Sequence, residues 1–341
     1  MKYSVKVSLR QSERLGNRLR ALQLKTEDFL NPQLFPPQTA ETEDTLRFFF
    51  FVTGIDHRTS PPGQSFEGVV DDEYFRGADL LWHLSVRRFN QNPNFFHPTR
   101  MAKITAQEVR EWLTVTQPKP VTIRNPAERA ALLRDSGTLL MNKYQGSVLN
   151  LLQKAHNRVS PNSRRKGGLL TLLSEFQAYE DPANKKSFLL LKFLLRRRLW
   201  AHDDVDSLRI PVDNHLTRIA LRTGIVTVSQ KLANLLRSHT TISLKTDISL
   251  RTTIGDAYQQ VGIASERSVF ELDDFFWHFG RECCVFDAPV CVARCQAHCF
   301  VSKNLLTLGC QNDCPLSSVC LAYDDSDQRS LVEPKTKTWY Y

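Results

Sequence analysis

The chain concentrates its thiol groups in one short segment. All eight cysteines lie between positions 283 and 320, and the first 282 residues contain none. Cysteines that only fill a hydrophobic core would be spread along the chain, so this clustering predicts a metal site or disulfides. Four thiolates suit zinc as well as an iron–sulfur cluster. Redox-active or inert thiols are the remaining alternative.

A metal is favoured over disulfides because disulfides need an oxidising compartment. The first residues, Met1–Lys6, lack the apolar core of a signal peptide, so we expect a cytoplasmic protein with reduced cysteines. The longest apolar runs, Phe48–Val52 and Phe188–Leu191, are too short to span a bilayer, and no membrane association is expected.

The cysteine spacing narrows the choice of metal. The segment begins Gly280-Arg281-Glu282-Cys283-Cys284, and it continues with Cys284-x6-Cys291 and Cys310-x3-Cys314-x5-Cys320. It resembles the 4Fe–4S loop of endonuclease III and related helix-hairpin-helix DNA glycosylases, where Gly-Arg precedes C-x6-C-x2-C-x5-C; the middle is longer here. The resemblance implies an iron–sulfur cluster, with zinc as the alternative. It also implies four ligands: Cys284, Cys291, Cys314 and Cys320. Cys310 is the first substitute, ahead of Cys283, Cys295 and Cys299.

A second segment could supply a catalytic carboxylate. Pro211-Val-Asp-Asn-His-Leu-Thr-Arg-Ile219 is similar to the V-D-T-H-x-x-R-I/V sequence that carries the catalytic aspartate of those glycosylases. Breaking a C1′–N bond builds positive charge on the sugar, and a carboxylate beside C1′ stabilises that cation and orients water. The resemblance implies this role for Asp213; a helix N-cap without chemistry is the alternative. His215 and Arg218 lie one turn further on, where they could bind substrate phosphate or support the structure.

Bifunctional glycosylases also use a lysine as a Schiff-base nucleophile, after a hairpin of sequence L-P-G-x-G-x-K. The corresponding segment here is Asp181–Ser187, which lacks both glycines. Those glycines let the backbone approach a DNA phosphate, so their absence argues against duplex DNA. Lys186 is the best positional match to the lysine and Lys192 is the alternative; a solvated helix face is the structural alternative for both.

A longer segment points to a narrower family. Glu128–Asn150 is similar to the E-R-x-x-x-L-x-x-S/T-G-x-x-L-x-x-K-F/Y-x-G-S-F/V-L-N segment of queuosine salvage proteins. These are N-glycosylases that resemble DNA glycosylases in fold and release the 7-deazaguanine base queuine from its nucleotide or nucleoside. Phe176-x-x-Tyr179-x-Asp181 and the terminal Tyr340-Tyr341 also agree with that family.

The chain departs from this family in the segment that holds the base. Where the family has D-T-L-N-F-S-F-W, with aromatic rings that can sandwich a base, this chain has Thr53–Ser60. Asp56, His57 and Arg58 replace the rings. These residues could bind the edge of a base or, through Arg58, a phosphate. The structural alternative is a polar surface loop after a buried strand.

The elements that must position these residues are mostly helical. Apolar periodicity predicts helices over Leu132–Leu152, Leu169–Tyr179, Lys186–Trp200 and Phe270–Phe279, and Phe48–Ile55 is the best strand candidate. Turn-forming residues gather in Asn31–Thr39, Ser60–Gln64, Thr116–Pro120, Ser160–Gly168 and Asp181–Lys185.

We therefore expect a mainly α protein with the two-lobed helical fold of helix-hairpin-helix DNA glycosylases and a C-terminal cysteine-rich cluster loop. The expected segments are an N-terminal extension (1–45), a helical glycosylase-like domain (46–282), the cluster loop (283–325) and a C-terminal tail (326–341).

Composition fits an ordinary globular protein, with 41% hydrophobic residues and a net charge of +9 that suits a polyanion or a nucleotide phosphate. The resemblances imply an N-glycosidase, expected as a monomer, that acts on a small nucleoside or nucleotide with a modified, 7-deazapurine base. A DNA glycosylase and a non-catalytic nucleic-acid-binding protein are the alternatives, so nucleic acid remains a candidate partner.

Overall fold

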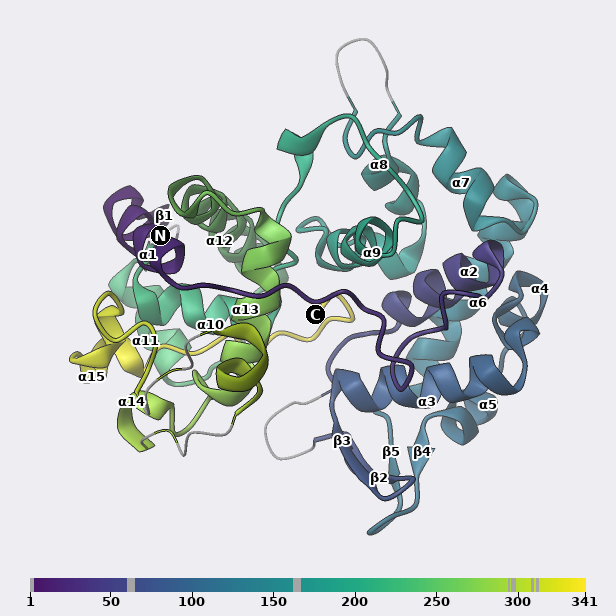
Figure 1. Ribbon diagram of the computed structural model, residues 1–341, viewed down its shortest axis with the longest axis horizontal. Coiled ribbons are helices and arrows are strands. Elements are labelled where there is room, and N and C mark those ends of the chain that lie inside the picture. Colours follow the sequence, from purple (N-terminus) through teal and green to yellow (C-terminus); the bar gives the residue numbers. More distant parts are fainter. Residues whose placement is uncertain are drawn as a thin grey trace. The chain divides into compact units, whose positions relative to one another are not determined.

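The computed structural model describes residues 3–59, 65–161, 167–293, 295, 299–307, 310 and 313–341. The predicted turn Ser60–Gln64, and the central part of the predicted turn Ser160–Gly168, lie outside these residues. The chain is mostly helical, which confirms the predicted fold class (Figure 1). Packing divides it into two compact units, Met1–Glu27 with Arg209–Thr338 and Asp28–Leu208 with Trp339–Tyr341. The division into four segments that the sequence indicates stays a prediction.

The first unit combines the start of the chain with its C-terminal third. Its elements are β1 (Val5–Val7), α1 (Leu9–Ala21), α10 (Asn214–Thr223), β6 (Val226–Val228), α11 (Gln230–Arg237), α12 (Leu244–Ser265), α13 (Val269–Glu282), α14 (Val290–Ala293), η4 (Val301–Leu305), η5 (Leu321–Tyr323) and α15 (Ser326–Arg329).

Two long-range contacts fix the start of the chain in this unit. Strand β1 pairs antiparallel with β6, with Val5 opposite Val228 and Val7 opposite Val226. Helix α1 packs along α12, and its buried residues include Leu15 and Leu19, which are fully excluded from solvent. The N-terminal residues are therefore part of the body that carries α10 and the cysteines.

The second unit holds the central part of the chain. Its elements are α2 (Thr42–Gly54), β2 (Glu67–Val70), β3 (Glu73–Arg76), α3 (Ala78–Gln91), η1 (Pro93–Phe96), α4 (Pro98–Met101), α5 (Ala106–Trp112), β4 (Thr114–Val115), β5 (Val121–Thr122), α6 (Pro126–Tyr144), α7 (Val148–Lys154), α8 (Leu169–Leu173), η2 (Gln177–Tyr179), α9 (Lys185–Arg196) and η3 (Val205–Ser207). Within the described residues, no helix of either unit is long and apolar enough to cross a membrane.

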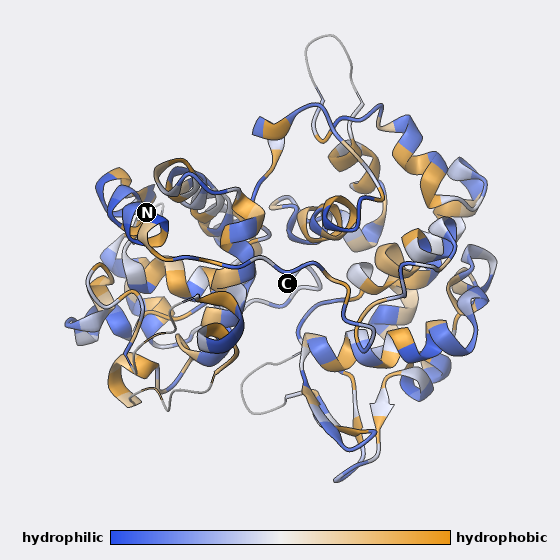
Figure 2. Ribbon diagram, in the orientation of Figure 1, coloured by the Kyte–Doolittle hydropathy of each residue, from blue (hydrophilic) through white to orange (hydrophobic). Residues whose placement is uncertain are grey.

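The strand predicted at Phe48–Ile55 is wrong, because residues 48–54 belong to helix α2 and Ile55 is its C-cap. Its apolar run is buried on every side, with Phe48 to Val52 at most 1% exposed. A short run of this kind cannot distinguish a buried strand from a buried helix by its periodicity. Helix α2 lies in the middle of the unit and contacts α3, α6, α7 and α9 (Figures 1 and 2). A helix surrounded in this way is apolar all round.

The predicted helices match the structure to different degrees. Helices α9 and α13 lie where Lys186–Trp200 and Phe270–Phe279 indicated helices. The segment Leu132–Leu152 instead divides into α6 and α7, because Gln145 and Gly146 both adopt positive φ and end the first helix. Ser147 then caps α7 by accepting a hydrogen bond from the backbone N–H of Asn150.

Helices α10 and α13 pack unusually closely in the first unit. A Cβ atom added to Gly280 of α13 would lie 2.5 Å from the Cβ of His215 on α10. Real Cβ atoms do not approach so closely, so this position needs a glycine for steric reasons. The close packing sets the start of α10, where Asp213 lies, against the end of α13.

We therefore predict that Gly280→Ala destabilises the first unit by about 1–3 kcal/mol, because the new methyl group overpacks this interface. The matched control is Gly255→Ala in α12, where the added Cβ meets only Val212, at 3.9 Å. The control should be neutral or stabilising by about 0.5–1 kcal/mol, since alanine favours helix. Thermal unfolding of both variants checks this. Equal melting temperatures for the two would show that the approach of the helices is not constrained.

Candidate functional site

In the first unit, Asp213 is the N-cap of helix α10. Its Oδ1 accepts a hydrogen bond of 2.8 Å from the backbone N–H of Leu216. The residue before it, Val212, is buried, whereas Asp213 itself is half-buried. The capping bond therefore holds the carboxylate in a defined position at a partly accessible helix start. Such a carboxylate can cap a helix and still meet a substrate.

Arg218, one turn along α10, is buried and binds protein groups on several sides. Its guanidinium donates to the carbonyl oxygens of Gly280 and Cys284, both at 2.8 Å, and to Glu333 Oε1 at 2.6 Å. It also donates to Nδ1 of His215 at 3.0 Å, so the imidazole proton of a neutral His215 lies on Nε2. The structure thus brings Asp213, His215 and Arg218 onto one helix start, with Arg218 joining α10 to the end of α13.

Arg222 repeats this pattern one turn later. Its guanidinium donates to the carbonyl oxygens of Val285 (2.6 Å), Phe286 (2.8 Å) and Leu331 (3.2 Å). It also lies 3.6 Å from the sulfur atom of Cys284. Sequence reasoning missed this residue, because nothing local to α10 indicates that its partners follow α13.

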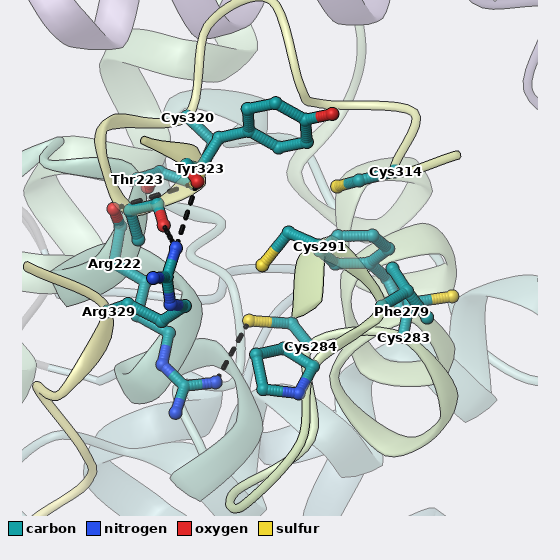
Figure 3. A pocket seen from close by; sticks show the side chains of 13 residues that line it. Arg222, Thr223, Phe279, Cys283, Cys284, Cys291, Cys314, Cys320, Tyr323 and Arg329 are labelled. Carbon is teal, nitrogen blue, oxygen red and sulfur yellow. Dashed lines mark hydrogen bonds between the residues drawn. The ribbon is translucent and has the colours of Figure 1, made fainter. Parts of the chain in front are cut away.

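Five cysteines line one cavity at the other end of α10 from Asp213, and one of them is Cys283. The cavity wall includes Arg222 and Thr223 from this helix and the four cysteines that the sequence indicated as ligands (Figure 3): Cys284, Cys291, Cys314 and Cys320. Gly224 ends α10 with φ +80°, and a side chain there would meet Leu321, next to Cys320. The end of the helix therefore fits tightly against the last part of the cysteine segment.

The environment of these thiols fits a bound metal. Burial, together with the neighbouring Cys284 and Cys291, raises the pKa of the Cys320 thiol to about 12. Burial and neighbouring thiols also raise the pKa values of Cys314 and Cys291. Clustered thiols oppose one another's ionisation, whereas a metal cation stabilises the thiolates. The thiols and the adjacent Arg222 fit a metal centre, since hydrogen bonds to the sulfur atoms are typical of such sites.

A second group of cysteines lies closer together. The sulfur atoms of Cys295, Cys299 and Cys310 all lie within 4.8 Å of one another, so this cluster could hold a metal ion. Sequence analysis placed these three behind the first set, because the glycosylase loop offers them no counterpart. The spacing Cys295-x3-Cys299 was the available indication, since paired zinc ligands are typically two to four residues apart.

In the second unit, the predicted lysine Lys186 is fully buried at the start of α9. Its Nζ donates to the carbonyl oxygen of Gly54 at 2.6 Å and lies 3.2 Å from Nδ1 of His57. Arg129 also approaches this Nδ1, at 3.3 Å, and His57 Nε2 lies 3.2 Å from Glu128 Oε1. With cationic donors on the Nδ1 side, a neutral His57 accepts there and donates from Nε2 to Glu128.

Burial lowers the pKa values of His57 and Lys186, and the packed cations add to this effect. Burial lowers the pKa of His57 well below its usual value, and the charges of Arg129 and Lys186 lower it further. Burial also lowers the pKa of Lys186, with further lowering by Lys185 and Arg129. A lysine with a lowered pKa has the property that a Schiff-base nucleophile needs. Arg129, which lies inside the family-like segment Glu128–Asn150, completes a cluster that sequence reasoning identified only in part.

Asp56 and Arg58 lie beside this cluster. Asp56 and His57 are 6% and 2% exposed and follow a helix, so the alternative of a polar surface loop after a strand is wrong. Trp82 Nε1 donates to Asp56 Oδ2 at 3.3 Å, and Lys185 Nζ donates to the carbonyl oxygen of Asp56 at 3.2 Å. The backbone N–H of Arg58, a partly exposed residue, donates to the carbonyl oxygen of Tyr341 at 3.0 Å.

The hairpin before α9 is closed by its own aspartate. Asp181 accepts hydrogen bonds from the backbone N–H groups of Ala183 and Lys185, both at 2.9 Å. Tyr341 donates its hydroxyl to the same carboxylate at 3.3 Å. Asn184 adopts φ 56°, so an asparagine occupies the left-handed conformation that a glycine would otherwise favour. A carboxylate thus occupies the backbone donors that a bound phosphate would use.

Lys192, the alternative lysine, is buried further along α9. Its Nζ lies 5.2 Å from the centre of the Phe29 ring, in a cation–π contact. Lys186, by contrast, shares the cluster with His57. The geometry therefore favours Lys186 over Lys192 as a functional lysine, and its role stays a prediction.

Comparison with known proteins identifies similar sequences. The family model described as queuosine salvage protein matches residues 38–282. A queuosine 5′-phosphate N-glycosylase/hydrolase from Dictyostelium discoideum is 22% identical over 173 residues, which are 47% of this chain and 50% of that protein. The match therefore spans about half the length of this relative.

The buried His57 leads to a prediction about pH. Its pKa is lowered in the folded protein, so below about pH 6.5 the unfolded chain binds a proton that the native imidazole does not. Stability should therefore fall as the pH falls. We expect the advantage of the wild type over His57→Asn in unfolding free energy to be constant above about pH 7. Below about pH 6 it should shrink by about 1.4 kcal/mol per pH unit.

Denaturant unfolding at several pH values measures this difference. An advantage that does not change between pH 7.5 and pH 5 would mean that native His57 takes up its proton as readily as the unfolded chain does. That result would contradict the buried, neutral state of the imidazole.

Proposed function

The chain belongs to the queuosine salvage protein family, and we propose that it is an N-glycosidase that hydrolyses the C1′–N bond of a queuosine-like nucleoside 5′-phosphate. The similarity to a queuosine 5′-phosphate N-glycosylase/hydrolase supports this substrate class. The observation that carries the proposal is Asp213, a half-buried carboxylate held by a capping bond at the start of α10.

In the proposed reaction, the C1′–N bond breaks and its electron pair leaves with the base. The sugar becomes cationic, and the carboxylate of Asp213 stabilises that charge. Water adds its oxygen to C1′ and loses one proton, and the base gains one proton. The products are the free base and ribose 5-phosphate. The capping bond to Leu216 restricts rotation of the carboxylate, so little reorganisation is needed during the reaction.

His215 and Arg218 act as positioning residues in this proposal. The hydrogen bonds of Arg218 to Gly280, Cys284 and Glu333 anchor the helix that carries Asp213. His215 is partly exposed, so its side chain is accessible to a substrate. In the second unit, we assign Lys186 as the candidate catalytic lysine and Asp56, His57 and Arg58 as candidate substrate-binding residues. The buried cationic cluster around His57 supports a role with an anionic or polar substrate.

We further propose that Cys284, Cys291, Cys314 and Cys320 bind a 4Fe–4S cluster. When bound, the cluster supplies cross-linking of the cysteine segment rather than chemistry on the substrate. Arg222 and Thr223, which line the thiol cavity, lie at the opposite end of α10 from Asp213. A helix of ten residues is about 15 Å long, so this site is remote from the carboxylate.

The structure offers less support to a DNA glycosylase. The backbone donors of the hairpin before α9 already bind the carboxylate of Asp181, which would repel a DNA phosphate. The Nζ atoms of Lys185 and Lys186 donate hydrogen bonds to the buried carbonyl oxygens of Asp56 and Gly54, respectively. A small nucleotide needs no such hairpin.

The proposal predicts the effect of Asp213→Asn. Asparagine is as good an N-cap as aspartate, so it preserves the bond to Leu216 while removing the negative charge. Base release from a queuosine 5′-phosphate should fall by at least about 10²–10³-fold, which corresponds to about 3–4 kcal/mol. The melting temperature should stay unchanged. Mass spectrometry of released base measures the rate.

Asp213→Ala serves as the companion variant, since it removes both charge and cap and should also cost about 1 kcal/mol in stability. Turnover by folded Asp213→Asn protein at a rate near that of the wild type would refute the catalytic role.

The proposal also makes a prediction about duplex DNA. We expect only non-specific binding, with Kd weaker than roughly 1 μM at about 150 mM salt, because the net charge of +9 alone attracts the phosphates. Affinity should drop steeply along a salt series, and a modified base in the duplex should not change it. Nanomolar binding that depends on the modified base and persists at 150 mM salt would favour DNA repair instead.

A further inference from the structure

The eight cysteines divide into two groups of four. The first group, Cys284, Cys291, Cys314 and Cys320, lines the cavity at the end of α10, and Cys283 also borders this cavity. Cys295, Cys299 and Cys310 lie outside that cavity wall and form the compact group with sulfur atoms within 4.8 Å of one another. Three thiols account for three corners of a tetrahedral metal site. The remaining cysteine, Cys283, is the candidate for the fourth corner.

Cys283 and Cys284 are neighbours in the chain, but they point to different groups. Successive side chains at the end of a helix diverge by about 100°, so two adjacent cysteines there cannot easily bind one ion. Figure 3 shows the sulfur atom of Cys283 directed away from those of Cys284 and Cys291. The thiols near Cys283 come from both groups: Cys299 and Cys310 from the second, and Cys314 from the first. The position of Cys283 at the C-cap of α13 therefore allows it to join the second group.

We propose that Cys283, Cys295, Cys299 and Cys310 form a second metal centre that binds one zinc ion, separate from the iron–sulfur ligands. Zinc–sulfur bonds are about 2.3 Å long, so four thiolates around one zinc lie about 3.8 Å apart. The sulfur atoms of Cys295, Cys299 and Cys310, within 4.8 Å of one another, are already near this spacing. Within the described residues, the first group contains no such compact set. Wider spacing suits a cluster, whose iron atoms and sulfides lie between the thiolates.

The surroundings of the second group fit a structural metal site. The backbone N–H of Ser302 donates to the sulfur of Cys299 at 3.4 Å, and the N–H of Cys310 lies 3.4 Å from the Ser302 hydroxyl. Bonds of this kind orient thiolate ligands. Between these cysteines, Leu306 forms a β-bridge with Leu24, which lies after α1. Zinc would therefore fix the segment that connects the N-terminal residues of the first unit to the end of α13.

The test is metal analysis of the full chain, purified without oxygen, and it uses no activity measurement. We expect about one zinc and roughly four iron atoms per chain, with broad absorbance near about 400 nm from the iron–sulfur cluster. Cys299→Ser should lose the zinc and keep the iron and the absorbance. Cys291→Ser, the matched control from the other group, should lose the iron and keep the zinc.

X-ray absorption at the zinc edge of the wild type keeps the proposal testable if Cys299→Ser does not fold. Four sulfur neighbours at about 2.3 Å are expected. Zinc bound by nitrogen or oxygen, less than about 0.2 zinc per chain in iron-loaded protein, or loss of zinc from Cys291→Ser alone would each overturn the second site. Because these readouts do not involve base release, failure of the glycosidase proposal would leave this result unaffected.

Discussion

The first unit depends on two buried arginines that lie one turn apart on helix α10. At the end of α13 and just after it, backbone carbonyl groups have no partners within a helix, and Arg218 and Arg222 donate hydrogen bonds to four of them: Gly280, Cys284, Val285 and Phe286. A helix end that is buried needs such donors, and positive charge near a helix C-terminus is also favourable. Leaving a buried carbonyl without its donor costs about 1–3 kcal/mol. Losing either arginine would leave two of these carbonyl groups without a donor.

If the chain is the proposed glycosidase, this constraint would explain how its cysteine-rich segment could support the reaction without taking part in it. The arginines join α10 to the backbone around Cys284, while Asp213 caps the other end of the same helix. Metal centres that cross-link the cysteine segment would hold this backbone in place. Rigid support at one end of the helix would then fix the carboxylate at the other. Small displacements of a catalytic group are costly, so such support has a direct functional value.

Several of these features were predictable from the sequence, for local reasons. Asp213 precedes an amphipathic segment, which is typical of an N-cap, and the mainly helical fold followed from apolar periodicity. The helix at Phe48–Val52 was not predictable, because burial on every side removes the periodicity that distinguishes helix from strand. The partners of Arg222 and Arg129 were also hidden, since they come from distant parts of the chain. The proposed separate roles of Cys283 and Cys284 required the direction of the helix end, which spacing alone does not give.

The central claim, cleavage of the C1′–N bond, is tested most directly by identifying the products. The full chain would be incubated with queuosine 5′-phosphate in phosphate-free buffer, and all products would be measured by liquid chromatography and mass spectrometry. Hydrolysis at C1′ predicts free base and ribose 5-phosphate in equal amounts. Release of inorganic phosphate with an intact nucleoside, or recovery of the unreacted nucleotide from metal-loaded protein, would contradict it.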